Sequence, residues 1–193
     1  MNPPGGPARL YVLTHGANRL LERPALGLVC SVQCPGSVIL KLYDAIRELR
    51  DAGVTVLGGF HSPMERECLD LLLRGTQPVV IATARQRSRL SAEWKAAIAG
   101  HRLAVIAPSD TTSRRTTSAL AVQRNVLVAG LASVIFVPCA SPGGKTEALA
   151  LATMGRGKKV VTLDDPANEG LLAAGAAALS TADVLAMLGM SAK

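Results

Sequence analysis

Short apolar runs and amphipathic segments alternate along the chain. Apolar, mostly β-branched runs predict strands at 10–13, 26–30, 54–57, 78–82, 103–107, 134–137 and 159–163. Segments with apolar residues every three or four positions predict helices at 38–49, 63–74, 92–99, 118–131 and 145–154, and two more within 168–188. Strands that are apolar throughout need cover on both faces. The pattern therefore predicts an α/β fold: a Rossmann-like, doubly wound, mostly parallel sheet of about six to seven strands with helices on both faces.

The composition agrees with one compact domain. The chain has 193 residues, 49% of them hydrophobic, which is enough for a single core. We expect a flexible N-terminus at 1–8 and one Rossmann-like domain at 9–193. No apolar run approaches the roughly 18 residues of a membrane span, and the Pro- and Gly-rich start does not resemble a signal peptide. The sequence thus favours a cytoplasmic protein that does not contact membranes.

The four cysteines form no metal-binding or disulfide pattern. No CxxC pair occurs among Cys30, Cys34, Cys68 and Cys139. A disulfide scaffold and a zinc ribbon are therefore not expected. We interpret the cysteines as small core residues, with Cys30 and Cys139 at strand ends.

The charge distribution favours a polyanionic partner. The net charge is +7, and 85–124 contains only Glu93 and Asp110 as acids. The basic residues of this block are Arg85, Arg87, Arg89, Lys95, Arg102, Arg114, Arg115 and Arg124. Aromatic residues are scarce, so any nucleic acid would be held mainly through its phosphates.

The loops that follow the strands are the first places to look for a site, because ligands of doubly wound folds sit beyond the carboxyl ends of the strands. The first loop begins at Ser31 and leads into a helix N-terminus. The second carries Gly58, Gly59, His61 and Ser62. Its glycines would let a ligand approach the backbone. The alternative is that Ser62 only caps the next helix, with Glu65 three residues later, and that His61 is solvated.

A third candidate loop follows the strand at 134–137. It contains Gly143, Gly144, Lys145 and Thr146 and opens a helix. A P-loop would need a glycine at the position of Cys139, so we reject a nucleoside triphosphatase with a Walker A motif. A glycine-rich turn that offers backbone donors and one lysine to an anion remains.

A charged pair interrupts an apolar helix. Arg124 and Asn125 lie within 121–131, which is otherwise mostly apolar. Together with Arg114 and Arg115, both Arg124 and Asn125 are candidate nucleic-acid contacts. The alternative is that Arg124 extends to solvent and Asn125 is a buried hydrogen-bonding residue.

The segment 124–131, with the sequence RNVLVAGL, resembles the RNRIIAGL signature of the DNA processing protein A (DprA/Smf) family. The segment 52–59, AGVTVLGG, is similar to that family's AGVTVVSG strand and loop, and 155–160 follows in the family's order. The resemblance covers about 26–163. It departs from the pattern at Val126, at 63–65 where the family has Gly-Ile-Asp, and in the first loop, which lacks Gly-Ser-Arg. The resemblance implies a divergent, single-domain relative without a winged-helix tail. Family members bind single-stranded DNA and help to load the RecA recombinase.

Two other groups of the same superfamily remain open. Lysine decarboxylase-like phosphoribohydrolases, which release a base from nucleoside monophosphates, carry a PGGxGTxxE loop. Here Pro142, Gly143 and Gly144 match it, but Glu147 stands three residues too early for the catalytic carboxylate. Molybdenum-cofactor carriers are the other alternative.

We therefore expect a nucleotide- or single-stranded-DNA-binding protein of DprA/Smf type rather than an enzyme. Glycine-rich loops at helix N-termini would hold the phosphate, and no cofactor is needed. We also expect a homodimer, because the C-terminal segment is rich in apolar residues. These residues are Leu171, Leu172, Leu179, Leu185, Met187 and Leu188. The alternative is that they cover the sheet within one chain.

Overall fold

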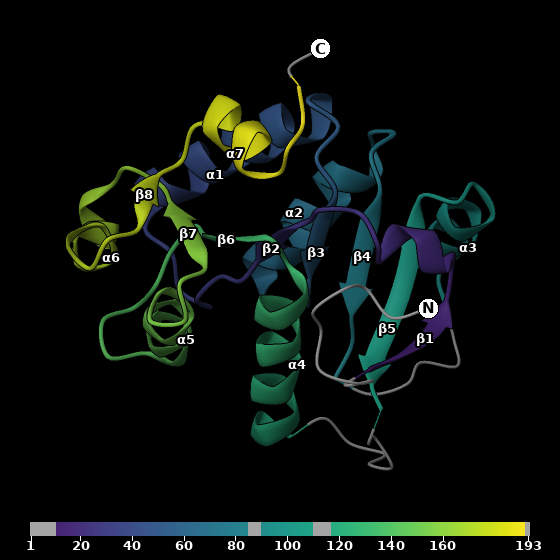
Figure 1. Cartoon of the computed structure of the whole chain (residues 1–193), viewed down its shortest axis with the longest axis horizontal. Helices are drawn as coiled ribbons and strands as arrows, with labels where there is room; N and C mark the ends of the chain where they lie inside the picture. Colours follow the sequence, from purple (N-terminus) through teal and green to yellow (C-terminus); the bar gives the residue numbers. More distant parts are fainter. Residues whose placement is uncertain (1–10, 85–89, 110–116, 192–193) are drawn as a thin grey trace.

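A computed structural model describes residues 11–84, 90–109 and 117–191. Its centre is one sheet of eight strands. The strands are β1 (Tyr11–His15), β2 (Leu26–Leu28), β3 (Val56–Gly58), β4 (Val79–Ala82), β5 (Leu103–Pro108), β6 (Val134–Val137), β7 (Lys159–Thr162) and β8 (Ala177–Ala178). They lie side by side in the order β1-β5-β4-β3-β2-β6-β7-β8 (Figure 1). Strand β1 is antiparallel to β5, and the other pairs are parallel.

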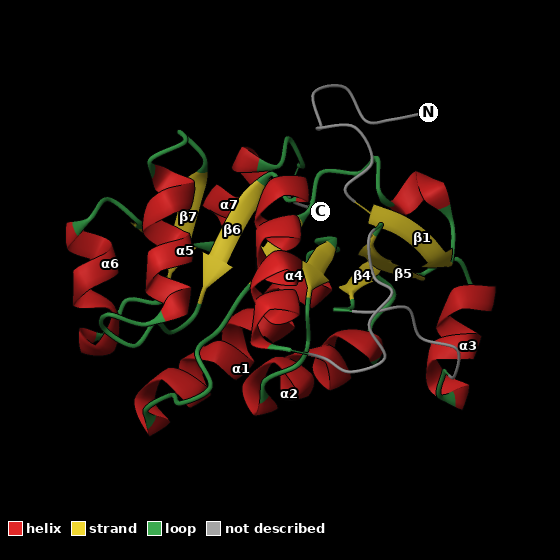
Figure 2. Cartoon of the chain, turned by 90° about the horizontal axis from the view of Figure 1, so that it is seen from below, coloured by secondary structure: helices red, strands yellow, loops and turns green. Residues whose placement is uncertain are grey.

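Helices connect the strands and cover both faces of the sheet. The α-helices are α1 (Gly36–Asp51), α2 (Pro63–Leu73), α3 (Ala92–Ala99), α4 (Ser118–Leu131), α5 (Lys145–Met154), α6 (Glu169–Ala173) and α7 (Thr181–Met187). Two 3₁₀ turns, η1 (Asn18–Leu20) and η2 (Pro166–Asn168), complete the connections. Helices α1 and α2 lie together on one side of the strands (Figure 2).

The core consists of two apolar clusters, one on each face of the sheet. Strand β4 shows the division: Val79 and Ile81 belong to the cluster under α1, α2, α3 and α7, and Val80 and Ala82 to the cluster under α4, α5 and α6. Alternate residues of a strand point to opposite faces. A strand buried on both faces must therefore be apolar at every position, as the sequence pattern predicted.

The chain winds outward from the middle of the sheet in two directions. From β2 it proceeds through β3 and β4 to β5, and then returns across the sheet to β6, which lies on the other side of β2. Strands β2 and β6 therefore flank the point where the winding direction reverses. Loops at the carboxyl ends of neighbouring strands diverge there, which leaves room for a ligand.

The predicted fold class is confirmed, and the element limits agree closely. Helices α3, α4 and α5 begin and end at the predicted residues. The sheet has eight strands rather than six to seven, because the short β8 pairs with β7. Helix α2 begins with the predicted capping box, in which Ser62 Oγ accepts from the Glu65 amide.

The C-terminal leucines cover the sheet of their own chain. Leu171, Leu185 and Leu188 are buried in the core, and Leu179 and Met187 pack against it. Their apolar surface is therefore used within the chain, and it does not support the expected homodimer. In the described parts of the chain, no helix is both long enough and apolar enough to cross a membrane.

Candidate functional site

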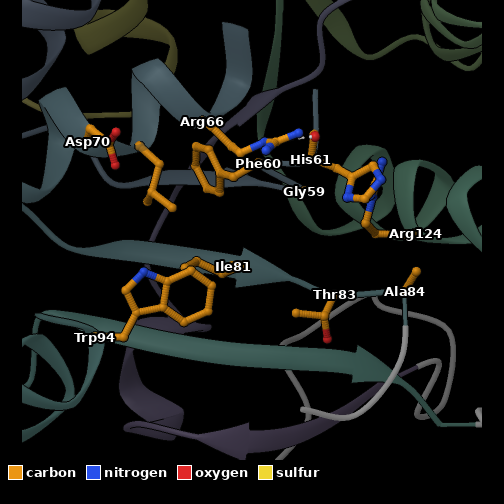
Figure 3. A pocket seen from close by; sticks show the side chains of 11 residues that line it. Gly59, Phe60, His61, Arg66, Asp70, Ile81, Thr83, Ala84, Trp94 and Arg124 are labelled. Carbon is orange, nitrogen blue, oxygen red and sulfur yellow. Dashed lines mark hydrogen bonds between the residues drawn. The ribbon is translucent and has the colours of Figure 1, made fainter. Parts of the chain in front are cut away.

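A cleft of about 460 Å³ opens beyond the carboxyl ends of β3 and β4. Its lining comes from the loop after β3, from helices α2, α3 and α4, and from the end of β4. The lining residues are Gly59, Phe60, His61, Arg66, Leu69, Asp70, Ile81, Thr83, Ala84, Trp94 and Arg124. In Figure 3, Phe60 and Arg66 form one wall, Ile81 and Trp94 face them, and Arg124 lies at one end beside Gly59 and His61.

The loop between β3 and α2 takes an unusual backbone path. Phe60 has φ of 48°, a left-handed conformation that is strained for a bulky side chain. A Cβ at Gly58 would lie 3.0 to 3.2 Å from three carbons of the Phe60 ring. Glycine at 58 thus lets the ring lie close against the backbone. The conformation directs Gly59 and His61 to the cleft.

Glu65 holds this loop in place from inside the protein. Its side chain is almost fully buried. One carboxylate oxygen accepts from the amides of His61 at 2.8 Å and Ser62 at 3.2 Å. The other accepts from the amide of Cys30 at 3.1 Å. A single carboxylate therefore joins the end of β2 to the loop after β3, well beyond the helix cap that the sequence indicated.

Arg124 is a buried cation in the wall of the cleft. Only 6% of the residue is exposed, so the alternative interpretation, that it extends to solvent, is wrong. Asn125, which is half-buried, accepts on Oδ1 from Arg124 Nε at 3.1 Å and from the Nη2 amino group at 2.8 Å. Burial lowers the pKa of the guanidinium, and the charge of Glu65 opposes this shift. An arginine nevertheless remains protonated at neutral pH.

The guanidinium of Arg124 reaches the cleft only because residue 59 is glycine. A Cβ at this position would lie 2.4 Å from Arg124 Nε and 2.7 Å from Cζ, far closer than such atoms approach. Within the described residues, no acceptor is found for the Nη1 amino group of Arg124. The site therefore presents a fixed guanidinium whose Nη1 group can donate to a ligand. It lies beside Gly59, where no side chain blocks the approach.

Further groups around Arg124 suit an anionic ligand with an aromatic part. Arg66 donates from Nε to the His61 carbonyl at 3.2 Å, which places a second guanidinium on the same loop. Trp94, from α3, is half-buried and presents an indole surface. Asp70 adds one negative charge to the lining. Among residues 11–84, 90–109 and 117–191, no group of three or more His, Cys, Asp or Glu side chains is arranged to hold a metal ion.

The first loop contributes to a different crevice, beside the Arg124 cleft. Ser31 Oγ accepts from the Ser141 amide at 3.0 Å, and the Ser31 amide donates to the Cys139 carbonyl. Ser31 thus ties the end of β2 to the loop after β6. The crevice between these loops has a volume of about 340 Å³.

The glycine turn before α5 uses its donors within the chain. The Gly143 amide donates to Glu147 Oε2 at 2.7 Å, and the Gly144 amide to the Ser141 carbonyl. Gly143 has φ of 69°, and Lys145 is exposed at the helix start. An anion would have to displace the Glu147 carboxylate to reach the Gly143 amide. None of Gly143, Gly144, Lys145 and Thr146 lines either of the two described crevices.

The structure thus brings together part of the predicted site. Gly59, His61 and Arg124 line one cleft, and Ser62 and Asn125 support them. Arg114 and Arg115 lie outside the described residues. Arg66 and Trp94 were not predicted as site residues from the sequence. The sequence offered a hint of each residue. Arg66 lies at the start of the helix capped by Ser62, next to the candidate loop, and Trp94 is the only tryptophan of the chain.

Comparisons with known proteins give matches in structure only. No family model matches the chain, and no curated protein matches it by sequence. DNA processing protein A from Helicobacter pylori, solved in a study of its single-stranded DNA binding mode, superposes with a TM-score of 0.76 at 14% identity, over 98% of this chain and 94% of that one. The DprA of Streptococcus pneumoniae gives 0.70 at 16% identity, over 91% of this chain, which spans 64% of that protein.

Molybdenum cofactor proteins are more distant structural neighbours. The molybdenum cofactor binding protein of Rippkaea orientalis gives a TM-score of 0.58 at 14% identity, over 86% of this chain and 94% of that one. A molybdenum cofactor carrier protein of Chlamydomonas reinhardtii gives 0.56 at 14% identity, over 86% and 96%. At these identities the likeness concerns the fold. The chain has the Rossmann-like fold of DNA processing protein A, and the resemblance found in its sequence is confirmed at that level.

Proposed function

We propose that the protein binds single-stranded DNA, one nucleotide of which occupies the cleft at Arg124. The main support for this proposal is the buried guanidinium of Arg124. Asn125 fixes it by hydrogen bonds, and it packs against the backbone of Gly59. A buried charge is costly without a partner. A phosphate would supply the missing acceptor through charge-assisted hydrogen bonds.

The other walls of the cleft support a nucleotide rather than a small inorganic anion. Trp94 and Phe60 offer aromatic surface on which a base can stack. A cleft of about 460 Å³ falls within the size range of small-ligand sites. Single-stranded DNA is the ligand named for the H. pylori neighbour, and the basic block of the sequence suits an extended polyanion.

The dependence of affinity on salt tests this proposal. Each phosphate that a protein neutralises on a single strand contributes about −0.7 to the slope of log affinity against log salt. One phosphate contact each from Arg124, Arg66 and the predicted Arg114 and Arg115 should give a slope of roughly −3. Isothermal titration calorimetry with a short oligothymidylate at several salt concentrations measures this slope. The absence of binding at low salt would refute the proposal.

The alternative to single-stranded DNA is a small ligand bound within the cleft, and the molybdenum cofactor neighbours support it. Their similarity in fold makes a phosphate-bearing cofactor a second candidate for this chain. Such a ligand would bind with little salt dependence and without help from a longer strand. Phosphoribohydrolase activity is the other alternative. Steady release of free base from nucleoside monophosphates, abolished by Glu147→Gln, would establish it.

We also propose that two copies of the chain pair as a homodimer. The support is the apolar surface that the described chain leaves exposed on α4, at Val122 and Val126, and on α5, at Leu151. Light scattering at micromolar concentration should give twice the mass of one chain. The double variant Val122→Lys/Val126→Lys should be a monomer. A monomeric unmodified protein would refute the proposal.

A further inference from the structure

Three of the four cysteines gather where the winding of the sheet reverses. Cys30 follows β2, Cys34 lies in the loop before α1, and Cys139 follows β6. The Sγ atoms of Cys30 and Cys34 are 3.4 Å apart. Cys139 Sγ lies 3.7 Å from the Gln33 carbonyl oxygen, to which it donates. None of the three takes part in the cleft at Arg124.

The environment of Cys34 favours its thiolate. Hydrogen bonding from Cys30, and to a lesser extent from Cys139, lowers the pKa of Cys34 to about 7, against the opposing effects of burial and of the Glu65 charge. The same contact raises the pKa of Cys30, so Cys30 keeps its proton. Burial raises the pKa of Cys139 to about 12. A large fraction of Cys34 is therefore thiolate at neutral pH, beside two protonated thiol neighbours.

Cys34 is also the cysteine that a small solute can reach. It is half-buried, whereas Cys30, Cys68 and Cys139 are buried. It lines the crevice of about 340 Å³ between the loops after β2 and β6, and so does Cys139, but only 3% of Cys139 is exposed. It also precedes the first turn of α1, where the helix dipole favours a negative charge. Access and thiolate character coincide at this one sulfur.

We propose that Cys34 is a peroxide-reactive thiol and that Cys30 converts its oxidised form into a Cys30–Cys34 disulfide. The Cys34 thiolate attacks one oxygen of hydrogen peroxide, the O–O bond breaks, and hydroxide leaves. The product is a sulfenic acid, in which sulfur has lost two electrons to the peroxide. The Cys30 sulfur then attacks the Cys34 sulfur, the S–O bond breaks, and the Cys30 proton leaves with the oxygen as water.

The geometry requires only a local movement. A disulfide bond is about 2.05 Å long, so the sulfurs must approach by roughly 1.3 Å from their separation of 3.4 Å. Cys34 lies in a loop rather than in a helix or strand, which allows it to move. Cys30 is more constrained, because its amide donates to Glu65.

Tryptic peptides separate the possible products. Both Cys30 and Cys34 fall in the peptide 20–41, Cys68 in 67–74, and Cys139 in 125–145. After treatment of the folded protein with hydrogen peroxide, we expect peptide 20–41 to become lighter by two hydrogen atoms, and two of the four thiols to disappear. A disulfide that joins 20–41 to 125–145 would overturn the role of Cys30. Peroxide treatment that leaves 20–41 unchanged would overturn the proposal altogether.

Alanine variants assign the two roles. Cys34→Ala should abolish the reaction, and Cys30→Ala should leave a sulfenic acid at Cys34 that a cyclic diketone traps. Cys68→Ala is the matched control, because Cys68 is buried outside the cluster, and it should react like the unmodified protein. If an alanine variant fails to fold, alkylation of the unmodified protein still tests the proposal. Iodoacetamide should alkylate Cys34 of the native protein with a midpoint near pH 7, and a midpoint above pH 8.5, the ordinary cysteine value, would contradict the proposal.

Discussion

Arg124→Met is expected to weaken the binding of a single-stranded oligonucleotide by about 10- to 100-fold, because one charge-assisted hydrogen-bonding group contributes roughly 1.5 to 3 kcal/mol. The protein should remain folded. Methionine has a similar length, and it removes the cost of burying a charge for which no ion-pair partner is found among the described residues. Calorimetry at low salt measures the affinity, and thermal unfolding checks the fold.

Two further variants separate the position of the guanidinium from its charge. Gly59→Ala keeps Arg124 but places a Cβ 2.4 Å from its Nε, so the guanidinium must move and affinity should fall. Arg23→Met is the matched control, since Arg23 is exposed and precedes β2, at the amino ends of the parallel strands, whereas the cleft opens at their carboxyl ends. Its loss removes the same net charge. Equal losses of affinity for Arg23→Met and Arg124→Met would contradict a specific role for Arg124.

Glu65→Ala is expected to lower the free energy of unfolding by about 3 to 5 kcal/mol. The variant deprives three backbone amides of their acceptor, those of Cys30, His61 and Ser62. Each buried donor left without a partner costs about 1 to 3 kcal/mol. In a chain of this length, one kcal/mol shifts the midpoint of thermal unfolding by roughly 2 to 4 °C. A decrease of about 10 °C in circular dichroism melting is the expected result.

Two neighbouring positions provide the comparison for Glu65. Ser62→Ala removes only the helix cap and should cost about 1 kcal/mol. Glu67 is exposed on the same helix, and Glu67→Ala should change stability by no more than about 0.5 kcal/mol. If Glu65→Ala cost no more than Ser62→Ala, the carboxylate would be a helix cap and would not hold the two loops together.

The sequence predicts the fold well because the determinants are local. Helices α3 and α4 begin after Ser91 and Thr117, whose side chains accept from the amides of Trp94 and Leu120. Such caps are visible in the sequence itself. Strand β8 was missed because Ala177 and Ala178 are too few and too small to form a pattern. Only their pairing with β7 makes them a strand.

The site was predicted only in part, because its chemistry depends on contacts between distant segments. Arg124 was predicted as a nucleic-acid contact, but its burial was not foreseen, because it depends on the missing side chain of Gly59, which lies in the loop after β3. Cys30 and Cys139 are far apart in the chain and meet only because β2 and β6 are neighbours. The glycine turn at Gly143 looked available to an anion. The Gly143 amide already donates to the Glu147 carboxylate, and the sequence spacing of these residues did not reveal this contact.

The placement of Trp94 gives the protein an intrinsic optical probe. It is the single tryptophan of the chain, and it lies in the wall of the cleft that holds Arg124 (Figure 3). Excitation at the red edge of aromatic absorption therefore reports from one location. A base that stacks on the indole would quench its fluorescence, and exclusion of water would shift the emission to shorter wavelength. Unlabelled nucleotides, strands and cofactors can thus be ranked by their own effect on the light the protein emits.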